Sequence, residues 1–381
     1  MVSERARSVD PFIAMDVLER ASRREDAVHL EVGEPEFDPP ERVFDAAVDS
    51  LRSGNTDYTA ARGKPALRRA IADRYDSEYG VDVDPDRVIV TPGSSPGLLL
   101  AMAALVDAGD EVVLTDPHYA CYPNFVRVLD GRVRTVPLRA AEGFQPDVSA
   151  FASALGPETS ALLVNSPANP TGAVMAGSAL ESLVAAAADR DVTIVADEIY
   201  HGLSYDATEH TVLEYTDDAV VLDGFSKRYG MTGWRLGWMV VPPALVDAVN
   251  RLAQNLLICA PNFVQDAGAA ALDTDPARLD DIRETYRERR DILLEAVADW
   301  GLDAGYTPSG AYYLLVDVSD LPGDSLAVAD RFLAEAGVAV TPGVDFGERA
   351  ADYVRFSYAT DTESIKEGVR RIEKLLGTVD R

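Results

Sequence analysis

The chain has 381 residues, of which 47% are apolar, and this is enough for a sizeable core and for either two domains or one large domain with an appendage. Its formal net charge of −29, from 64 acidic and 35 basic residues, makes nucleic acid an unsuitable partner, because phosphate binding needs basic patches. The sequence has no apolar run of the roughly 18 residues that a membrane span needs, and its two cysteines without framework spacing predict a reduced, cytoplasmic protein.

The middle of the chain alternates β-rich and helical segments. Strands are expected at residues 87–91, 111–115, 133–137, 161–165, 192–196, 219–223 and 237–241. Helical patterns follow several of them, as in SPGLLLAMAALVDAG after the first strand. Nearly continuous apolar strands that alternate with helices indicate an α/β fold, with a mainly parallel, seven-stranded sheet between helices.

A long helical stretch is expected from about Pro243 to Trp300, and after it the pattern changes. Strands at 311–318, 337–342 and 352–359, with helices at 326–337 and 361–377, indicate a smaller α+β domain. The N-terminal segment is too short to fold alone, so we expect it to pack on this domain. The predicted division is a large domain at 41–285 and a small domain formed by 1–40 and 286–381.

The residues that follow each predicted strand are those of interest, because open α/β sheets bind ligands at the carboxyl ends of their strands. After the first strand, PGSSPG contains Gly93, Ser94 and Ser95 ahead of a helix. Two interpretations are open: an anion cradle of backbone N–H groups and hydroxyls, or a glycine turn with a serine cap. The motif GxxxxGK[ST] is absent, so the segment is not a nucleotide P-loop.

Two further strand ends carry unusual segments. DPHYACYPN places Tyr119 and Tyr122 near the same edge, where an aromatic ring either stacks on a flat ligand or packs on a helix. NSPANPTG, at 165–172, is a rigid irregular loop that either aims an amide at a ligand or simply connects strand and helix.

Asp197 directly follows five apolar residues at the end of a predicted buried strand. A carboxylate there needs a partner, which is either a set of backbone donors or a ligand cation. Tyr200 is expected nearby. His201 has no second histidine or cysteine at a metal-binding spacing, so no metal site is predicted.

Lys227 is one of only four lysines and lies in GFSKRYGMTGWRLGW, after an apolar run. Apolar surroundings disfavour the ammonium form, so the pKa should be lowered and the amine should be a usable nucleophile. The charges of Arg228 and Arg235 are expected to lower this pKa further. Together, the strand-end segments suit a ligand with a phosphate, a flat ring, a phenolic oxygen, a basic ring nitrogen and an aldehyde. Pyridoxal 5′-phosphate has all five.

With these motifs the sequence resembles the class I/II aminotransferases, the fold-type I enzymes that depend on pyridoxal phosphate, from EVGEPEFDPP to YVRFSYA. The resemblance implies three catalytic residues, Lys227, Asp197 and Tyr200. Lys227 would form the Schiff base, Asp197 would pair with the ring nitrogen and Tyr200 would bind the phenolic oxygen. It also implies that Tyr119 stacks on the ring. The other residues that it assigns are Gly93, Ser94, Ser95, Ser226 and Arg235 at the phosphate, Asn169 at the phenolic oxygen and the substrate, and Gly33 and Arg355 at the substrate.

Tyr58, in YTAARG, resembles the tyrosine that reaches the phosphate of the neighbouring subunit, which implies a homodimer with active sites at the subunit interface. Two positions depart from the family pattern. Gly224 stands where many relatives have a serine or threonine that binds the phosphate, and Ser95 stands where some aspartate-using relatives have a lysine.

The function implied is reversible, ping-pong transfer of an α-amino group between an amino acid and a 2-oxo acid (EC 2.6.1 type), with glutamate and 2-oxoglutarate as an expected pair. A C–S β-lyase of the same fold would keep the same residues. A non-catalytic regulator that binds pyridoxal phosphate would need a DNA-binding module, and the chain has no basic N-terminal extension to hold one. The residues do not predict which side chain the substrate carries.

The acidic charge has two interpretations. The protein is either an ordinary acidic enzyme or a halophilic one, adapted to a cytoplasm in which salt screens self-repulsion and net charge maintains solubility. The acidic residues are spread along the chain and lysine is scarce, and this favours the halophilic interpretation.

Overall fold

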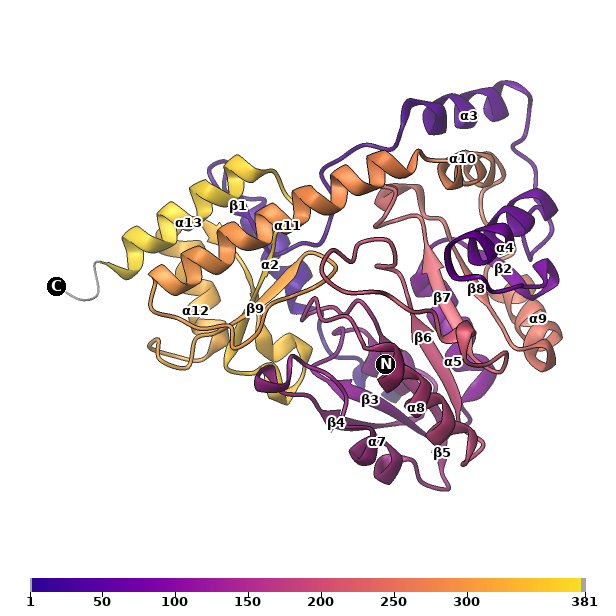
Figure 1. The fold of residues 1–381 in the computed structure, drawn as a ribbon, viewed down its shortest axis with the longest axis horizontal. Coiled ribbons are helices and arrows are strands. Elements are labelled where there is room, and N and C mark those ends of the chain that lie inside the picture. Colours follow the sequence, from indigo (N-terminus) through magenta and orange to yellow (C-terminus); the bar gives the residue numbers. More distant parts are fainter. Residues whose placement is uncertain (1, 378–381) are drawn as a thin grey trace.

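The computed structural model describes residues 2–377 and has a seven-stranded sheet at its centre (Figure 1). The strands are β2 (Val88–Thr91), β3 (Glu111–Asp116), β4 (Arg132–Pro137), β5 (Thr159–Asn165), β6 (Thr193–Asp197), β7 (Val220–Gly224) and β8 (Gly237–Val240). Their spatial order is β2-β8-β7-β6-β5-β3-β4. Strand β8 is antiparallel to both of its neighbours, and the other six run in one direction. The predicted mainly parallel α/β sheet is confirmed.

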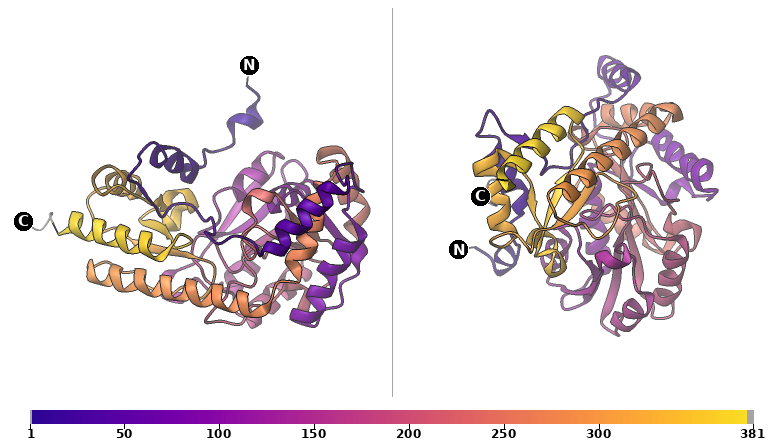
Figure 2. Two further views of the ribbon diagram at one scale, coloured as in Figure 1. Left: turned by 90° about the horizontal axis from the view of Figure 1, so that it is seen from above. Right: turned by 60° about the vertical axis from the view of Figure 1, so that its left-hand side comes forward.

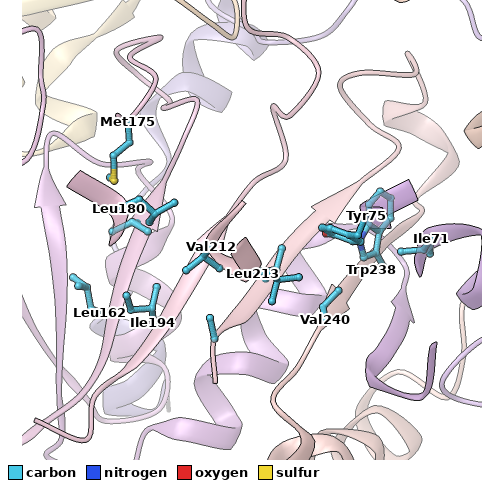
Figure 3. Close-up of a cluster of buried hydrophobic side chains, with 14 of the residues drawn as sticks. Ile71, Tyr75, Leu162, Met175, Leu180, Ile194, Val212, Leu213, Trp238 and Val240 are labelled. Carbon is cyan, nitrogen blue, oxygen red and sulfur yellow. The ribbon is translucent and has the colours of Figure 1, made fainter. Parts of the chain in front are cut away.

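Both faces of this sheet are buried, as the apolar strands predict. Along β3, Val112 and Leu114 pack on one face with helices α5 (Ser94–Leu105) and α9 (Val246–Leu256), whereas Val113 packs on the other. That second face is covered by helices α4 (Pro65–Tyr79), α7 (Val148–Ala154), α8 (Gly177–Ala188) and α10 (Asn262–Leu272). Figure 3 shows part of this core, where Tyr75 of α4 lies against Trp238 of β8.

A second apolar core lies beside the sheet, around a three-stranded antiparallel sheet with the order β11-β12-β9. Its strands are β9 (Tyr313–Asp317), β11 (Thr341–Pro342) and β12 (Tyr353–Ser357). The helices of this region are α2 (Ile13–Ala21), α11 (Pro276–Asp299), α12 (Ser325–Arg331) and α13 (Thr362–Leu376), and α11 and α13 lie side by side (Figure 2). The N-terminal segment joins this region, because β1 (Val28–His29) pairs with β10 (Val338–Ala339) in parallel. The domain boundary at residue 285 stays a prediction, since α11 runs through it without a break.

Three remaining helices complete the described fold: α1 (Glu4–Arg7), α3 (Glu41–Arg52) and α6 (Tyr122–Arg127). None of the helices in residues 2–377 is long and apolar enough to cross a membrane.

Two predicted elements differ from the structure. The helical stretch at 243–300 is divided into α9, α10 and α11, with breaks before Asn262 and before Pro276. Pro261 and Pro276 lack the N–H that a helix interior requires, so each lies at a helix start instead. The strand expected at 337–342 is divided into β10, which pairs with β1, and β11, which pairs with β12.

Candidate active site

A cavity at the carboxyl edge of the large sheet brings together most of the predicted site residues. Those that line it are Gly33, Ser94, Ser95, Tyr119, Asn169, Asp197, Tyr200, Ser226, Lys227, Arg235 and Arg355. They come from the segment after β1, the start of α5, the end of β6, the segments after β3, β5, β6 and β7, and β12. The antiparallel strand β8 starts at this same edge, so Arg235, just before it, also reaches the cavity.

Lys227 is half-buried, and its Nζ donates a hydrogen bond to the Gly33 carbonyl, at 2.7 Å. Burial lowers the pKa of Lys227 to about 8, and the charges of Arg355 and Arg235 act in the same direction. Nearby Glu34 opposes them without restoring the usual value. Near neutral pH a usable fraction of Lys227 is therefore an uncharged amine, as the apolar sequence around it predicts.

Asp197 is the last residue of β6 and is 4% exposed. Burial raises its pKa to about 6, although the Tyr122 hydroxyl donates to Oδ2 at 2.7 Å and the Ile199 N–H donates to Oδ1 at 3.2 Å. Two donors without a close cation leave this carboxylate poorly compensated. A ligand cation in the cavity would supply the missing charge.

Arg355 and Asn169 line the same cavity and contact each other. Arg355 Nη1 donates to Asn169 Oδ1 at 2.8 Å, and Nη2 donates to the Glu31 carbonyl and to Thr341 Oγ1. Arg355 Nε is buried and has no hydrogen-bond partner in residues 2–377. A buried guanidinium that keeps a free donor is suited to bind a carboxylate.

The cavity also has a group of residues that suits an anion. Ser94 and Ser95 are the first residues of α5, so their N–H groups and the positive end of the helix dipole face the same edge. Arg235 reaches this helix start closely: a Cβ on Gly93 would lie 2.5 Å from Arg235 Nη2. Gly93, with φ of 101°, is therefore needed both for the turn and for the arginine.

The structure explains why position 224 is a glycine. It pairs with Gly237 across β7 and β8, and a Cβ on Gly224 would lie 3.0 Å from the Gly237 Cα and 3.1 Å from the Leu236 carbonyl oxygen. A serine or threonine would crowd this cross-strand contact. Ser226 lines the cavity beside Lys227 and is the hydroxyl that this segment offers there.

Comparisons with known proteins show the family to which the chain belongs. A family model described as aminotransferase class I and II matches residues 25–372. The chain is 40% identical to the valine–pyruvate aminotransferase of Mycobacterium tuberculosis, with 96% of each chain covered. It is 38% identical to the aspartate/prephenate aminotransferase of Thermus thermophilus, with 99% of each chain covered. The chain belongs to the class I and II aminotransferases. The crystal structure of a Thermus thermophilus aspartate aminotransferase with maleate has a TM-score of 0.95 at 38% identity, over 98% of this chain and 99% of that one.

The aminotransferase is an enzyme that depends on pyridoxal phosphate and acts on amino acids and 2-oxo acids, in the fold of fold-type I enzymes. Its own residues fit the cofactor on three observations. The amine of Lys227 has a lowered pKa, the buried carboxylate of Asp197 lacks a close cation, and the start of α5 with Arg235 forms an anion cradle.

Arg228 of this aminotransferase binds Glu78 of α4, to which its guanidinium donates two hydrogen bonds at 2.8 and 2.6 Å. The charged groups that act most on the Lys227 pKa are Glu34, Arg355 and Arg235. The predicted effect of Arg235 is confirmed, and that of Arg228 stays a prediction.

Tyr58 of the aminotransferase lies apart from the cavity. It is 81% exposed and does not line the site of its own chain. A role across a subunit interface therefore stays a prediction.

Sequence reasoning missed several residues that line the site of the aminotransferase. They are Phe12, Ala14, Met15, Glu31, Val32, Leu98, Asn165, Ile199, Thr232 and Tyr313, while Tyr122 was noted only for its position near the edge. Asn165 donates to the Asp197 carbonyl and accepts from the Asn169 N–H, so it fixes both loops. Its place at the last position of an expected strand was a usable signal. Phe12 and Tyr313 carried no such signal, because tertiary packing brings them to the cavity.

Proposed function

We propose that the cavity residues carry out α-amino transfer with the roles that the sequence predicts. The observation that supports this most is the meeting of half-buried Lys227 with buried Asp197 and Arg355 around one cavity. When bound, pyridoxal phosphate supplies an electron-accepting ring that stabilises negative charge at the Cα of the amino acid. Lys227 would hold its aldehyde, Asp197 its ring nitrogen, and Asn169 and Tyr200 its phenolic oxygen.

The phosphate would be held at the start of α5. Gly93, Ser94 and Ser95 provide the loop and the helix N–H groups, and Arg235 provides the charge. Ser226 is the proposed hydroxyl donor in place of the one missing at position 224. Tyr119, whose ring packs edge-on against Tyr122 with 5.3 Å between the ring centroids, would lie against the cofactor ring.

Proton transfer is assigned to Lys227. Its Nζ takes the proton from the amino acid Cα, and the pKa of about 8 suits this task because the neutral amine is accessible near physiological pH. Arg355 binds the α-carboxylate and so orients the Cα–H bond toward Lys227, with the Gly33 backbone close by.

Glutamate and 2-oxoglutarate remain the proposed amino-donor and acceptor pair in a ping-pong cycle. The support is the family membership together with Arg355, which suits any 2-oxo acid carboxylate. Within residues 2–377 the cations that line the cavity are Lys227, Arg235 and Arg355, so a second substrate carboxylate would need a group from elsewhere. Pyruvate, which the name of the Mycobacterium tuberculosis relative includes, is therefore the comparison acceptor to test.

Single-turnover mixing tests this function. The loaded enzyme is mixed with a panel of amino acids, and loss of the visible absorbance of the lysine-bound cofactor ranks the donors. Each 2-oxo acid is then added to recover the absorbance. Lys227→Ala should lack this absorbance band from the start, and a band that persists would refute the assignment of Lys227. Pyruvate and ammonia released without an acceptor would instead indicate a C–S β-lyase.

We further infer a homodimer in which Tyr58 acts on the partner site, and a reduced, cytoplasmic location. The exposed position of Tyr58 supports the first inference. Cys121 and Cys259, which form no disulfide, support the second.

A further inference from the structure

Tyr313 contacts two parts of the cavity that the proposed function uses separately. Its hydroxyl lies 2.9 Å from the Tyr200 hydroxyl, in a buried hydrogen bond. Its ring lies under Arg355, with the guanidinium carbon 4.4 Å from the ring centroid. Tyr313 is 2% exposed and itself lines the cavity.

The strand register explains why one residue reaches both groups. Tyr313 starts β9 and pairs with Ser357, whereas Arg355 pairs with Leu315. Residues two positions apart on adjacent strands lie on the same face, so Tyr313 and Arg355 project together toward the cavity. The ring of Phe346 also lies close to the guanidinium, with 4.7 Å from its carbon to the centroid.

The hydroxyl of Tyr313 has room only because residue 33 is glycine. A Cβ at Gly33 would lie 1.7 Å from the Tyr313 oxygen, which no adjustment of a few tenths of an ångström relieves. Burial raises the pKa of Tyr313, so the hydroxyl keeps its proton throughout the working pH range. A protonated Tyr313 can donate to Tyr200 and thereby direct the proton of Tyr200 elsewhere.

We propose that Tyr313 is a positioning residue that orients the Tyr200 hydroxyl toward the cofactor's phenolic oxygen and holds the Arg355 guanidinium for the substrate carboxylate. This inference rests on the proposed function. Hydrogen bonds that are linked in series strengthen one another, so the Tyr200 hydroxyl is a better donor when it also accepts from the Tyr313 hydroxyl. The ring of Tyr313 adds a desolvated cation–π contact that fixes the plane of Arg355.

Two substitutions separate the two contributions. Tyr313→Phe keeps the ring and removes the hydroxyl. The phenolic oxygen then receives a weaker hydrogen bond and becomes more basic, so the pH midpoint of the visible absorbance change of the loaded enzyme should rise, with little change in KM for the acceptor. Tyr313→Leu removes the ring as well. The KM for pyruvate or 2-oxoglutarate, whichever the wild type accepts, should then rise about tenfold, in line with the loss of a desolvated cation–π contact.

Tyr205→Phe is the matched control. Tyr205 and Tyr358 form another tyrosine–tyrosine hydroxyl pair, which is partly buried, and neither residue lines the cavity. This variant should leave both the pH midpoint and the KM unchanged. The proposal is overturned if Tyr313→Phe has the wild-type pH midpoint, or if Tyr313→Leu has the KM of Tyr313→Phe. A wild-type enzyme that shows no lysine-bound absorbance at all would instead refute the proposed function, so the two failures are distinguishable.

Discussion

Arg228 and Glu78 form an ion pair with two hydrogen bonds, and this pair connects the loop that carries Lys227 to helix α4. Arg74, one turn earlier on α4, donates to Glu78 at 3.0 Å and to Asp223 at 2.6 Å. Asp223 lies at the end of β7, four residues before Lys227. The segment that carries Lys227 is therefore fastened at both ends to a single helix, by charges that alternate in sign.

Glu78→Gln should destabilise the protein by about 3 kcal/mol, because it leaves two buried guanidinium groups without their shared carboxylate. Burial alone would raise the pKa of Glu78, but Arg74 and Arg228 outweigh it and lower the pKa to about 2. The contribution of the wild-type pair is therefore complete above the ordinary value of 4.5 and is lost as the pH falls from there toward 2. Denaturant unfolding at pH 7 and at pH 3 measures both effects.

Asp86→Asn is the control for this pair, since Asp86 binds Arg68 of the same helix but is 69% exposed. This substitution should lower the free energy of unfolding by no more than about 1 kcal/mol. Equal losses for Glu78→Gln and Asp86→Asn would contradict the special role of the buried cluster.

The uptake of pyridoxal phosphate by the apo-protein should accelerate with pH and level off above about 8, the pKa of Lys227. Below that value the fraction of neutral amine changes about tenfold per pH unit, and only the neutral amine attacks an aldehyde. Stopped-flow absorbance at a series of pH values gives the profile. Lys227→Arg should bind the phosphate group without developing the visible band, and a pH-independent uptake rate in the wild type would be inconsistent with the lowered pKa.

Asp197→Asn should stabilise the apo-protein while it impairs amino transfer. The pKa of Asp197 is raised to about 6, so this group favours the folded state less and less as the pH rises from its ordinary value of 3.8 through 6. A neutral amide removes that cost, and the Tyr122 hydroxyl can turn to accept from it. Thermal unfolding of the apo-protein at pH 8 should give a higher midpoint for the variant, by a few degrees. A lower midpoint would show that the carboxylate is stabilising without the cofactor.

Salt should stabilise the protein well beyond the range of ordinary screening. The net charge of −29 creates self-repulsion that weakens as the Debye length falls from about 10 Å at 0.1 M to about 3 Å at 1 M. Thermal unfolding in potassium chloride from 0.05 M upward should show a midpoint that is still rising near 1 M. An ordinary acidic enzyme would reach its plateau at a few tenths molar, and that result would count against the halophilic interpretation.

Mixed dimers test the predicted action of Tyr58 across subunits. Tyr58→Phe and Lys227→Ala should each lower activity as homodimers, the second almost completely. In a hybrid of the two, one site combines an intact Lys227 with an intact Tyr58 from the other chain. Hybrid formation by mixing and renaturation should therefore restore activity above that of either parent, and no restoration would indicate that Tyr58 acts within its own chain or not at all.

The sequence predicted the large sheet and most of the cavity because the ends of the strands can be recognised in it. Each apolar run ends at a defined residue, and Asp197, Asn169 and Lys227 come at or shortly after such ends. It could not predict which side of a loop each neighbour takes. Lys227 and Arg228 are adjacent, yet one faces the cavity and the other faces α4. For Tyr313 the sequence predicts only a strand position, since its contact with Tyr200 joins residues 113 positions apart. Pro261 and Pro276 mark the helix breaks in the sequence itself, although the helical pattern continues on both sides of each.

The pairing of Gly224 with Gly237 closes the loop between them into a hairpin whose two ends are direct cross-strand partners. Lys227 and Arg235 both belong to that hairpin. The residue proposed to bind the cofactor aldehyde and the residue proposed to bind its phosphate are therefore positioned by one short, continuous segment. For protein engineering, residues 224–237 are therefore a suitable segment to exchange between relatives. A graft that begins and ends at the glycine pair would transfer Lys227 and Arg235 together, whereas a graft that ends inside the hairpin would separate them.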